Sequence, residues 1–184
     1  MKLIITGGRY KGRYIVVSKQ KDLRPVMTMI REVFFNIIDV KGMDFLDLFA
    51  GTGIMGIEAI SRGATGSFFV EKNHILIKKL KENLIKLGID EKLWKIFKKD
   101  LRKPSDITFY GDSDINKKFD IVYTDPPFVF KIGIKLKNWI IRHTKEEGIV
   151  VLRRYKKEKE EFEDMELIDE RIYGDNKLYI YRKS

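Results

Sequence analysis

The stretch Asp47-Leu48-Phe49-Ala50-Gly51-Thr52-Gly53-Ile54-Met55-Gly56 decides the fold of this 184-residue chain. It leads from an apolar strand, expected over residues 43–48, into a helix expected over residues 53–62. Its glycines have the spacing G-x-G-x-x-G, and Glu71 stands twenty positions after Gly51, at the end of the next expected strand. Such a loop lets a nucleotide approach the backbone, and such an acid accepts from ribose hydroxyls. The pattern therefore predicts a site for an adenosine-containing cofactor, either NAD or S-adenosylmethionine.

The aspartate just upstream of the glycines bears on this choice. A pyrophosphate is anionic and binds at a helix N-terminus, so the Asp47 carboxylate is unhelpful to it. S-adenosylmethionine carries a sulfonium and an ammonium group, and an aspartate suits both. The position of Asp47 therefore favours S-adenosylmethionine.

The tetrapeptide Asp125-Pro126-Pro127-Phe128 directly follows a strand expected over residues 119–124. Ligands of open α/β sheets bind beyond the carboxyl ends of the strands, so we expect it to face the same crevice as the glycine loop. The Asp125 carboxylate and the Pro126 carbonyl can accept the two N–H groups of a nucleobase amine. Phe128 can stack on the base. The motif predicts a target-amine site for methyl transfer and is the stronger argument for S-adenosylmethionine.

Strand and helix patterns alternate after Gly42, which is typical of a mostly parallel, doubly wound sheet. We expect the Rossmann-like α/β fold of class I S-adenosylmethionine-dependent methyltransferases, with a mostly parallel seven-stranded sheet and a C-terminal antiparallel pair. A basic N-terminal extension, residues 1–41, would precede this domain, residues 42–184. The predicted elements are a hairpin over 3–6 and 13–17, strands over 43–48, 67–70, 93–97, 119–124, 148–152, 165–172 and 177–181, and helices over 28–40, 53–62, 74–87 and 132–143.

Most of the net charge of +10 lies in the first 31 residues, where eight basic residues oppose one acid, Asp22. Glycines and tyrosines are interleaved among the cations, a combination that suits the phosphates and bases of a nucleic acid. A solvated hairpin that binds nothing fits the same composition. The run over residues 153–161 mixes both charges, and we expect it to be a solvated face without function.

The chain contains no cysteine, which excludes disulfides, thiolate zinc sites, iron–sulfur clusters and a cysteine nucleophile. Methylation of pyrimidine C5 through a thiolate adduct and radical methylation through a cluster are therefore excluded. No apolar stretch reaches the ~20 residues of a membrane span, and the N-terminus is not a secretory signal. We expect a cytoplasmic protein with no membrane contact and no metal site.

Several segments together resemble the RsmD family, the small-subunit ribosomal RNA guanine-N2 methyltransferases of bacteria. The likeness runs nearly end to end, with one departure at residues 26–30, where the family usually has polar residues and this chain has Val-Met-Thr-Met-Ile. The matching segments are residues 7–13, Leu23-Arg24-Pro25, Arg31-Glu32, Phe35-Asn36, residues 46–53, Gly56, Glu58-Ala59, residues 61–64, residues 125–128 and Lys177-Leu178-Tyr179.

The resemblance implies methyl transfer from S-adenosylmethionine to the N2 amine of guanine 966 in 16S rRNA, within an assembling small subunit, by a monomer. Carried over by residue, it implies a target-amine site at Asp125, Pro126 and Phe128. It implies cofactor contacts at Asp47, Phe49, Gly51, Gly53, Glu71 and Asp100, with Glu71 at the ribose and Asp100 at the adenine amine. The basic residues expected to contact RNA are Arg9, Lys11, Arg13, Arg24 and Arg31.

Three other functions are compatible with parts of this pattern. A DNA or other RNA amino-methyltransferase, of the adenine-N6 type for example, uses the same catalytic motif, but only about 40 residues lie outside the core for sequence readout. An inactive methyltransferase fold that binds RNA as an assembly factor would not need an intact Asp-Pro-Pro-Phe motif. An NAD-dependent dehydrogenase would need a catalytic His, Tyr–Lys or metal constellation that the sequence does not display.

Overall fold

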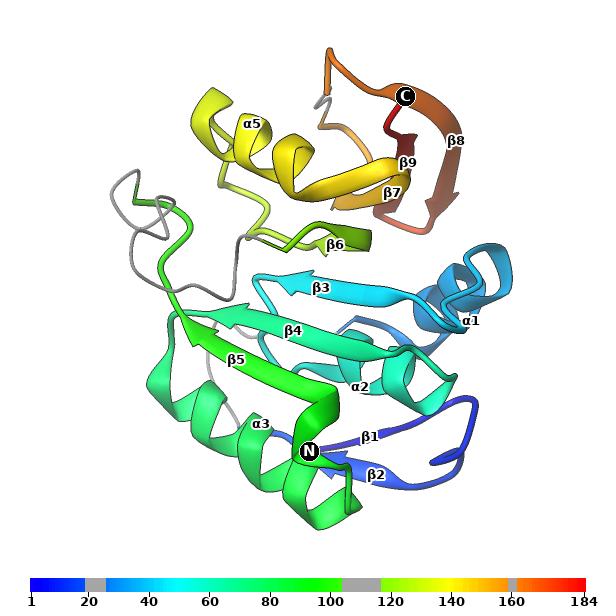
Figure 1. The fold of residues 1–184 in the computed structure, drawn as a ribbon, viewed down its shortest axis with the longest axis vertical. Helices are drawn as coiled ribbons and strands as arrows, with labels where there is room; N and C mark the ends of the chain where they lie inside the picture. Colours follow the sequence, from blue (N-terminus) through cyan, green and yellow to red (C-terminus); the bar gives the residue numbers. More distant parts are fainter. Residues whose placement is uncertain (19–25, 104–116, 159–161) are drawn as a thin grey trace. The chain divides into compact units, whose positions relative to one another are not determined.

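The computed structural model describes residues 1–18, 26–103, 117–158 and 162–184. The chain divides into two compact units, Met1–Lys98 and Lys99–Ser184, drawn from blue to green and from green to red in Figure 1. Each unit contains one part of the predicted chemistry. The glycine loop lies in the first unit, and the Asp-Pro-Pro-Phe motif lies in the second.

A three-stranded parallel sheet organises the first unit, in the order β5-β4-β3. Its strands are β3 (Asp44–Leu48), β4 (Gly66–Glu71) and β5 (Trp94–Lys98), and Leu48 pairs with Val70 at the end that carries the loop. Helices α2 (Ile54–Ser61) and α3 (His74–Leu87) follow the first two strands, and a short 3₁₀ turn, η1 (Glu91–Leu93), precedes β5. The expected strand–helix alternation is confirmed here.

Helix α3 begins and ends at the residues that its sequence predicts. The Asn73 side chain accepts hydrogen bonds from the backbone N–H groups of Ile75 and Leu76, which caps the first turn. Gly88 follows the last turn in the left-handed conformation, with φ +68°. Leucines at helical spacing, Leu76, Leu80, Leu84 and Leu87, are all buried.

The N-terminal segment shares a hydrophobic core with this sheet. Strands β1 (Lys2–Ile4) and β2 (Tyr14–Val16) form the predicted antiparallel hairpin. A single cluster joins apolar residues of the hairpin region to residues of α2, β4 and α3, namely Ile5, Tyr10, Ile15 and Val17 with Ile54, Ile57, Ile60, Phe69, Leu80, Leu84 and Leu87. The proposed boundary between residues 41 and 42 stays a prediction.

Helix α1 (Thr28–Ile37) is shorter than the expected 28–40. Its cap residue Ile38 is extended, and the Asp39 carboxylate accepts from the backbone N–H of Lys41 at 2.9 Å. This local hydrogen bond competes with a further helical turn, so the chain leaves the helix before Val40.

A buried ion pair fastens α1 to α2. Arg31 Nη1 lies 2.8 Å from Glu58 Oε1, and both side chains are fully buried. Glu58 Oε2 accepts from the Thr6 hydroxyl at 2.5 Å, and Arg31 Nη1 also donates to the Ile4 carbonyl at 3.0 Å. The side chain of Arg62 donates to the same Thr6 hydroxyl at 3.0 Å. The acid at position 58 therefore joins three separate segments of the first unit.

The second unit combines one parallel and two antiparallel strand pairs. Its strands are β6 (Phe119–Thr124), β7 (Thr144–Tyr155), β8 (Glu166–Tyr173) and β9 (Asn176–Arg182), and α5 (Ile134–His143) precedes β7. β6 pairs with β7 in parallel, whereas β9 lies antiparallel to both β7 and β8. The C-terminal antiparallel pair is thus confirmed, and the two units together supply the seven expected sheet strands within the described residues.

Strand β7 extends well beyond the expected residues 148–152, and this corrects a prediction. The run over residues 153–161 was expected to be a solvated face, but Arg153 and Arg154 are buried. They continue the pairing with β9, opposite Leu178 and Lys177. Charge alone suggests solvent exposure, whereas in the folded chain Arg153 is bound by Asp125 and Asn176, and Arg154 donates to the Phe130 carbonyl.

Within the residues that the structure describes, no helix is both long and apolar enough to cross a membrane.

Removing the acid at position 58 should destabilise the protein strongly. In Glu58→Ala the Arg31 guanidinium stays buried without its counter-ion, a change that typically costs about 3–5 kcal/mol of unfolding free energy. Urea unfolding measures the loss. The double variant Arg31→Met/Glu58→Leu removes both charges and should recover much of it.

The matched control is Asp169→Ala, which breaks the exposed Arg171–Asp169 pair. Exposed pairs contribute little, so its loss should be much smaller than that of Glu58→Ala. Equal losses in the two single variants would contradict the role given to the buried pair.

Candidate functional site

The glycine loop has an unusual backbone conformation. Phe49, Gly51 and Gly53 have φ angles of 59°, 54° and 71°, all in the left-handed region. For Phe49, which carries a side chain, this conformation is strained, and such strain is concentrated at ligand sites. A Cβ on Gly53 would also lie 2.3 Å from Leu80 Cδ1. Glycine is therefore required at position 53 both by the backbone angle and by the space.

The Glu71 carboxylate ties this loop to the end of β4. Its Oε2 accepts from the Gly51 N–H at 2.9 Å, and its Oε1 accepts from the N–H groups of Lys72 and Asn73 at 2.9 and 2.8 Å. A carboxylate has roughly four acceptor sites, so three bonds leave room for about one more donor. The acid and the loop are thus adjacent, as their spacing predicts.

Asp47 lies beneath the start of α2. Its side chain is buried, and Oδ2 accepts from the Gly56 N–H at 3.2 Å. An acid at a helix N-terminus is favoured by the helix dipole. It also places a negative charge where a pyrophosphate would otherwise bind, so the site suits a cationic ligand better than a diphosphate.

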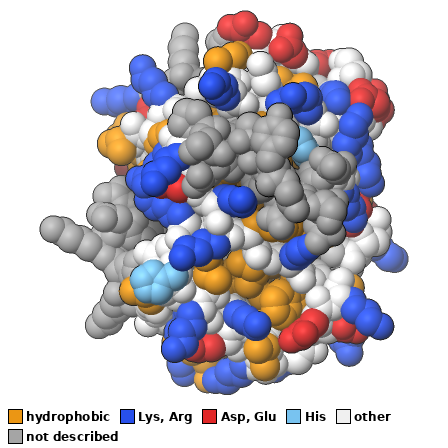
Figure 2. Space-filling view, turned by 60° about the vertical axis from the view of Figure 1, so that its left-hand side comes forward, with side chains coloured by type: hydrophobic (Ala, Val, Ile, Leu, Met, Phe, Trp, Pro, Cys, Tyr) orange, Lys and Arg blue, Asp and Glu red, His pale blue; other side chains and the backbone are white. Residues whose placement is uncertain are grey.

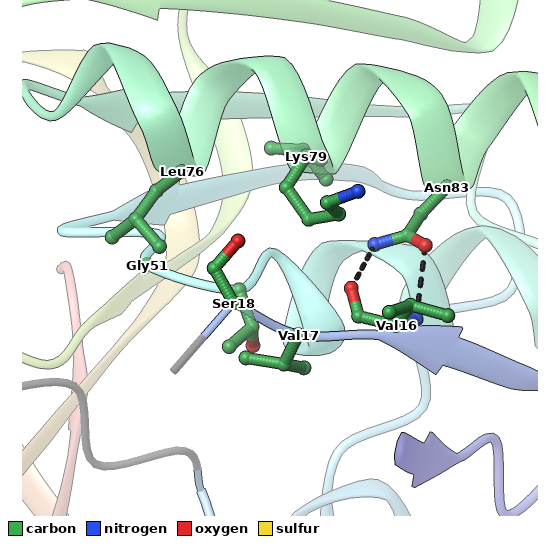
Figure 3. A pocket seen from close by; sticks show the side chains of 9 residues that line it. Val16, Val17, Ser18, Gly51, Leu76, Lys79 and Asn83 are labelled. Atoms are coloured by element: carbon green, nitrogen blue, oxygen red, sulfur yellow. Dashed lines mark hydrogen bonds between the residues drawn. The ribbon is translucent and has the colours of Figure 1, made fainter. Parts of the chain in front are cut away.

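A small cavity lies beside the loop, between the end of β2 and helix α3 (Figure 3). Its volume of about 10 Å³ is that of a single water molecule, so it does not hold a cofactor. Asn83 bridges its rim, since its Oδ1 accepts from the Val16 N–H at 3.0 Å and its Nδ2 donates to the Val16 carbonyl at 2.9 Å. These bonds fix the hairpin next to the glycine loop.

Asp100, the residue expected at the adenine amine, belongs to the second unit. Its carboxylate accepts from Arg102 Nε at 2.9 Å and Nη2 at 2.8 Å. The side chain is 14% exposed. The Asp100 carboxylate is thus paired with the Arg102 guanidinium, and its part in cofactor binding stays a prediction.

The target-amine residues follow β6 in the second unit. The Asp125 side chain is 13% exposed, and its Oδ2 lies 2.7 Å from Arg153 Nη2. Pro126 is buried next to it, and the half-buried Phe128 ring lies 6.0 Å from the Tyr155 ring between centroids. Burial raises the pKa of the Asp125 carboxyl above its usual range, and the Arg153 guanidinium opposes this rise. An acceptor and an aromatic surface therefore lie close together at a strand exit.

Arg153 is a site residue that the sequence interpretation missed. Its Nη1 donates to Asn176 Oδ1 at 2.7 Å, and its guanidinium lies 5.5 Å from the Phe128 ring centroid. The sequence near Arg153 contains no signal of this role; the strand register reveals it, because Thr124 pairs with Leu152, and Asp125 and Arg153 are the next residues along the chain.

The predicted RNA-contacting residues are placed in three ways. Arg9, Lys11 and Arg13 are exposed, and Arg13 also donates to the Leu87 and Lys86 carbonyls at 2.8 and 3.1 Å, at the end of α3. Arg24 lies outside the described residues. Arg31 is buried against Glu58, which directs its cation into the protein instead of toward a surface ligand.

Lys and Arg side chains are distributed over the face drawn in Figure 2, with acidic side chains among them. On this face the charged side chains are therefore spread out and not gathered into one patch.

The chain is similar over nearly its whole length to one protein family. The family model described as Conserved hypothetical protein 95 matches residues 3–182. Ribosomal RNA small subunit methyltransferase D of Buchnera aphidicola subsp. Baizongia pistaciae is 37% identical over 135 residues, which are 67% of this chain and 60% of that protein. The protein of the same description from Buchnera aphidicola subsp. Acyrthosiphon pisum is 31% identical over 169 residues, 84% of each chain. The match therefore spans less than two thirds of the first relative.

Solved structures share the fold. "Putative methyltransferase yhhF from Escherichia coli" superimposes with a TM-score of 0.84 over 100% of this chain and 99% of that chain, at 22% identity. The structure of SMU.776, "a putative methyltransferase complexed with SAH", has a TM-score of 0.63 over 84% of this chain and 48% of that chain, at 13% identity. At these identities the likeness concerns the fold, and it confirms the predicted Rossmann-like methyltransferase fold.

Adding a methyl group at the glycine loop should destabilise the protein. In Gly53→Ala the left-handed conformation costs about 1–2 kcal/mol and the overlap with Leu80 a further ~1–3 kcal/mol of unfolding free energy. The control is Gly174→Ala, where φ is +59° and a Cβ meets no atom within 4 Å. Urea unfolding should show the larger loss for Gly53→Ala, and equal losses would contradict the close packing described for the loop.

Proposed function

Because the chain belongs to the RsmD family, we propose that it transfers a methyl group from S-adenosylmethionine to the exocyclic N2 amine of guanine 966 in 16S rRNA. The observation that carries this proposal lies at the exit of β6, where the largely buried Asp125 carboxylate and the Phe128 ring both contact Arg153. One acceptor and one stacking surface are what a planar base with an amine needs.

The residues of the first unit fit S-adenosylmethionine. When bound, this cofactor supplies an activated methyl group on a sulfonium. Asp47 presents negative charge at the start of α2, where it favours a cationic ligand, and Glu71 retains acceptor capacity for a ribose hydroxyl. The residues proposed to hold the cofactor are Asp47, Phe49, Gly51, Gly53, Glu71 and, from the second unit, Asp100.

The residues of the second unit would hold the target amine. The Asp125 carboxylate and the Pro126 carbonyl would each accept one N–H of the amine, which favours localisation of its lone pair. Prolines at 126 and 127 restrict φ to near −65° and so hold the carbonyl direction. Phe128 would stack on the base after it leaves its neighbours in the RNA. Rate enhancement would come mainly from orientation.

Recognition of the RNA is assigned to the exposed N-terminal cations Arg9, Lys11 and Arg13, together with Arg24. Arg31 is left out of this surface because its guanidinium is bound to Glu58 inside the protein. The proposed substrate is the 16S rRNA of an assembling small subunit, met in the cytoplasm by a monomer.

Methyl transfer by the purified protein tests this function and its amine site together. Labelled S-adenosylmethionine is incubated with assembling small subunits, stripped 16S rRNA and duplex DNA. We expect label in a ribosomal substrate, as N2-methylguanosine. Asp125→Ala should lower the rate at least about 10²-fold, because the amine loses an orienting acceptor.

Asp169→Ala is the control, since Asp169 is a partly exposed acid bound to Arg171 in the same unit. It should methylate at the rate of the parent protein. Label found only in duplex DNA would replace the proposed substrate by DNA. An undiminished rate in Asp125→Ala would overturn the assigned mechanism.

A further inference from the structure

We propose that Arg153, held in place by Asn176, is a positioning residue that orients both the Asp125 carboxylate and the Phe128 ring of the target-amine site. This inference rests on the proposed function, because it concerns the same site. It assigns a role to two residues outside the Asp-Pro-Pro-Phe motif, which come from β7 and β9.

The strand register brings Arg153 to Asp125. In the parallel pair of β6 and β7, Thr124 lies opposite Leu152. The two strands then separate, because Asp125 enters a loop while β7 continues to Tyr155. Asp125 and Arg153 directly follow this last pair, so they still lie next to each other. Arg153 Nη2 lies 2.7 Å from Asp125 Oδ2.

Asn176 fixes the guanidinium from the other side. It is the first residue of β9, and Tyr155 of β7 is its pairing partner. Its Oδ1 accepts from Arg153 Nη1 at 2.7 Å, while Nη2 is held by the carboxylate. A planar group bound at two separate nitrogens has little rotational freedom, and a lysine ammonium offers no such fork.

The same guanidinium also contacts the stacking residue. Phe128 lies 5.5 Å from the Arg153 guanidinium and 6.0 Å from the Tyr155 ring, measured to the ring centroid. A cation at this distance from an aromatic ring is attracted to it. One side chain therefore couples the direction of the acceptor to the direction of the aromatic surface.

The contact leaves the acid able to accept. The Arg153 contact with this carboxylate is between Nη2 and Oδ2, at 2.7 Å. An orienting cation on one oxygen and a target amine on the other are compatible in one carboxylate, which has about four acceptor sites. Arg153 therefore orients the Asp125 carboxylate without preventing it from accepting a further hydrogen bond.

Arg154, the next residue, fastens the far end of the same loop. Its Nη2 donates to the Phe130 carbonyl at 2.6 Å. Because successive side chains of a strand point to opposite faces, Arg153 and Arg154 hold the loop from different sides of β7. The segment from Asp125 to Phe130 is thus attached to β7 at both ends, which supports a loop held in a single shape.

Charge gives the contact a second consequence. Asp125 accepts an N–H group well only as a carboxylate, and burial favours its neutral form. Arg153 and Arg154 on β7 act against that tendency, and Tyr123 on β6 interacts with Arg153. Loss of the Arg153 charge should therefore raise the pKa of Asp125 and move the acid limb of the pH–rate profile upward.

The test compares Arg153→Met with Arg153→Lys, Asn176→Ala and the control Arg171→Met, which removes an exposed arginine of β8. Thermal unfolding and S-adenosylmethionine binding are measured for each variant. We expect Arg153→Met to lower kcat about 10–100-fold while the cofactor Kd changes less than about 2-fold, because the acceptor is misdirected. The acid limb of its pH–rate profile should shift to higher pH by about 1 unit or more.

Arg153→Lys keeps the positive charge but lacks the planar, two-nitrogen geometry of the guanidinium. Compared with Arg153→Met, it should return the acid limb of the pH–rate profile toward that of the parent but recover little of kcat. Asn176→Ala should lower kcat with no shift of the limb, and Arg171→Met should match the parent. An Arg153→Met rate that falls only with the folded fraction, at an unchanged acid limb, would overturn the proposal.

A readout that needs no substrate keeps the two proposals separate. NMR titration of the Asp125 carboxyl carbon should give a higher pKa in Arg153→Met than in the parent, and Arg153→Gln, which also removes the charge, serves if the methionine variant does not fold. A parent protein inactive on every RNA would contradict the proposed function alone. An Asp125 pKa unmoved by loss of the arginine charge would contradict the positioning role, whatever the substrate.

Discussion

A carboxylate removed from water must be given partners, and this constraint governs the structure. Glu58 is neutralised by Arg31 in the core of the first unit, and Asp125 by Arg153 in the second. Asp47 and Glu71 instead accept backbone N–H groups around the glycine loop. Each acid thereby fixes the segments that supply its donors, so the placement of charge and the shape of the chain are determined together.

The consequence for chemistry is an acceptor that is both desolvated and oriented. An acid in water would rotate and be solvated from all sides, whereas Asp125 is bound by an arginine that also contacts Phe128. For the proposed reaction, in which a weakly nucleophilic amine attacks an activated methyl group, orientation is the main contribution that a protein can make. The loop of the first unit has the complementary feature, a backbone held open by glycines and by Glu71.

Local sequence signals predicted most of the fold. β6 was predicted with its observed bounds, and α3 was predicted from its Asn73 cap to its Gly88 stop, because periodicity and capping act within a few residues. The spacing of Gly51 and Glu71 likewise predicted that the loop and the acid belong to one site, and in the structure the two residues are hydrogen-bonded to each other. These features depend on neighbours along the chain.

Pairings between distant segments were not predictable in this way. The sequence predicts a solvated Arg153 and an RNA-contacting Arg31, since nothing near them in the sequence identifies Asp125, Asn176 or Glu58 as partners. Arginine side chains in proteins are mostly exposed. Only the strand register and the helix packing reveal that these two are inside.

Nucleoside mass spectrometry of small-subunit rRNA tests the central claim most directly, in cells that carry the gene, lack it, or express Asp125→Ala in its place. The account predicts that one N2-methylguanosine is lost without the gene, returns with the parent protein and does not return with Asp125→Ala. An rRNA nucleoside profile identical in all these cells would contradict it.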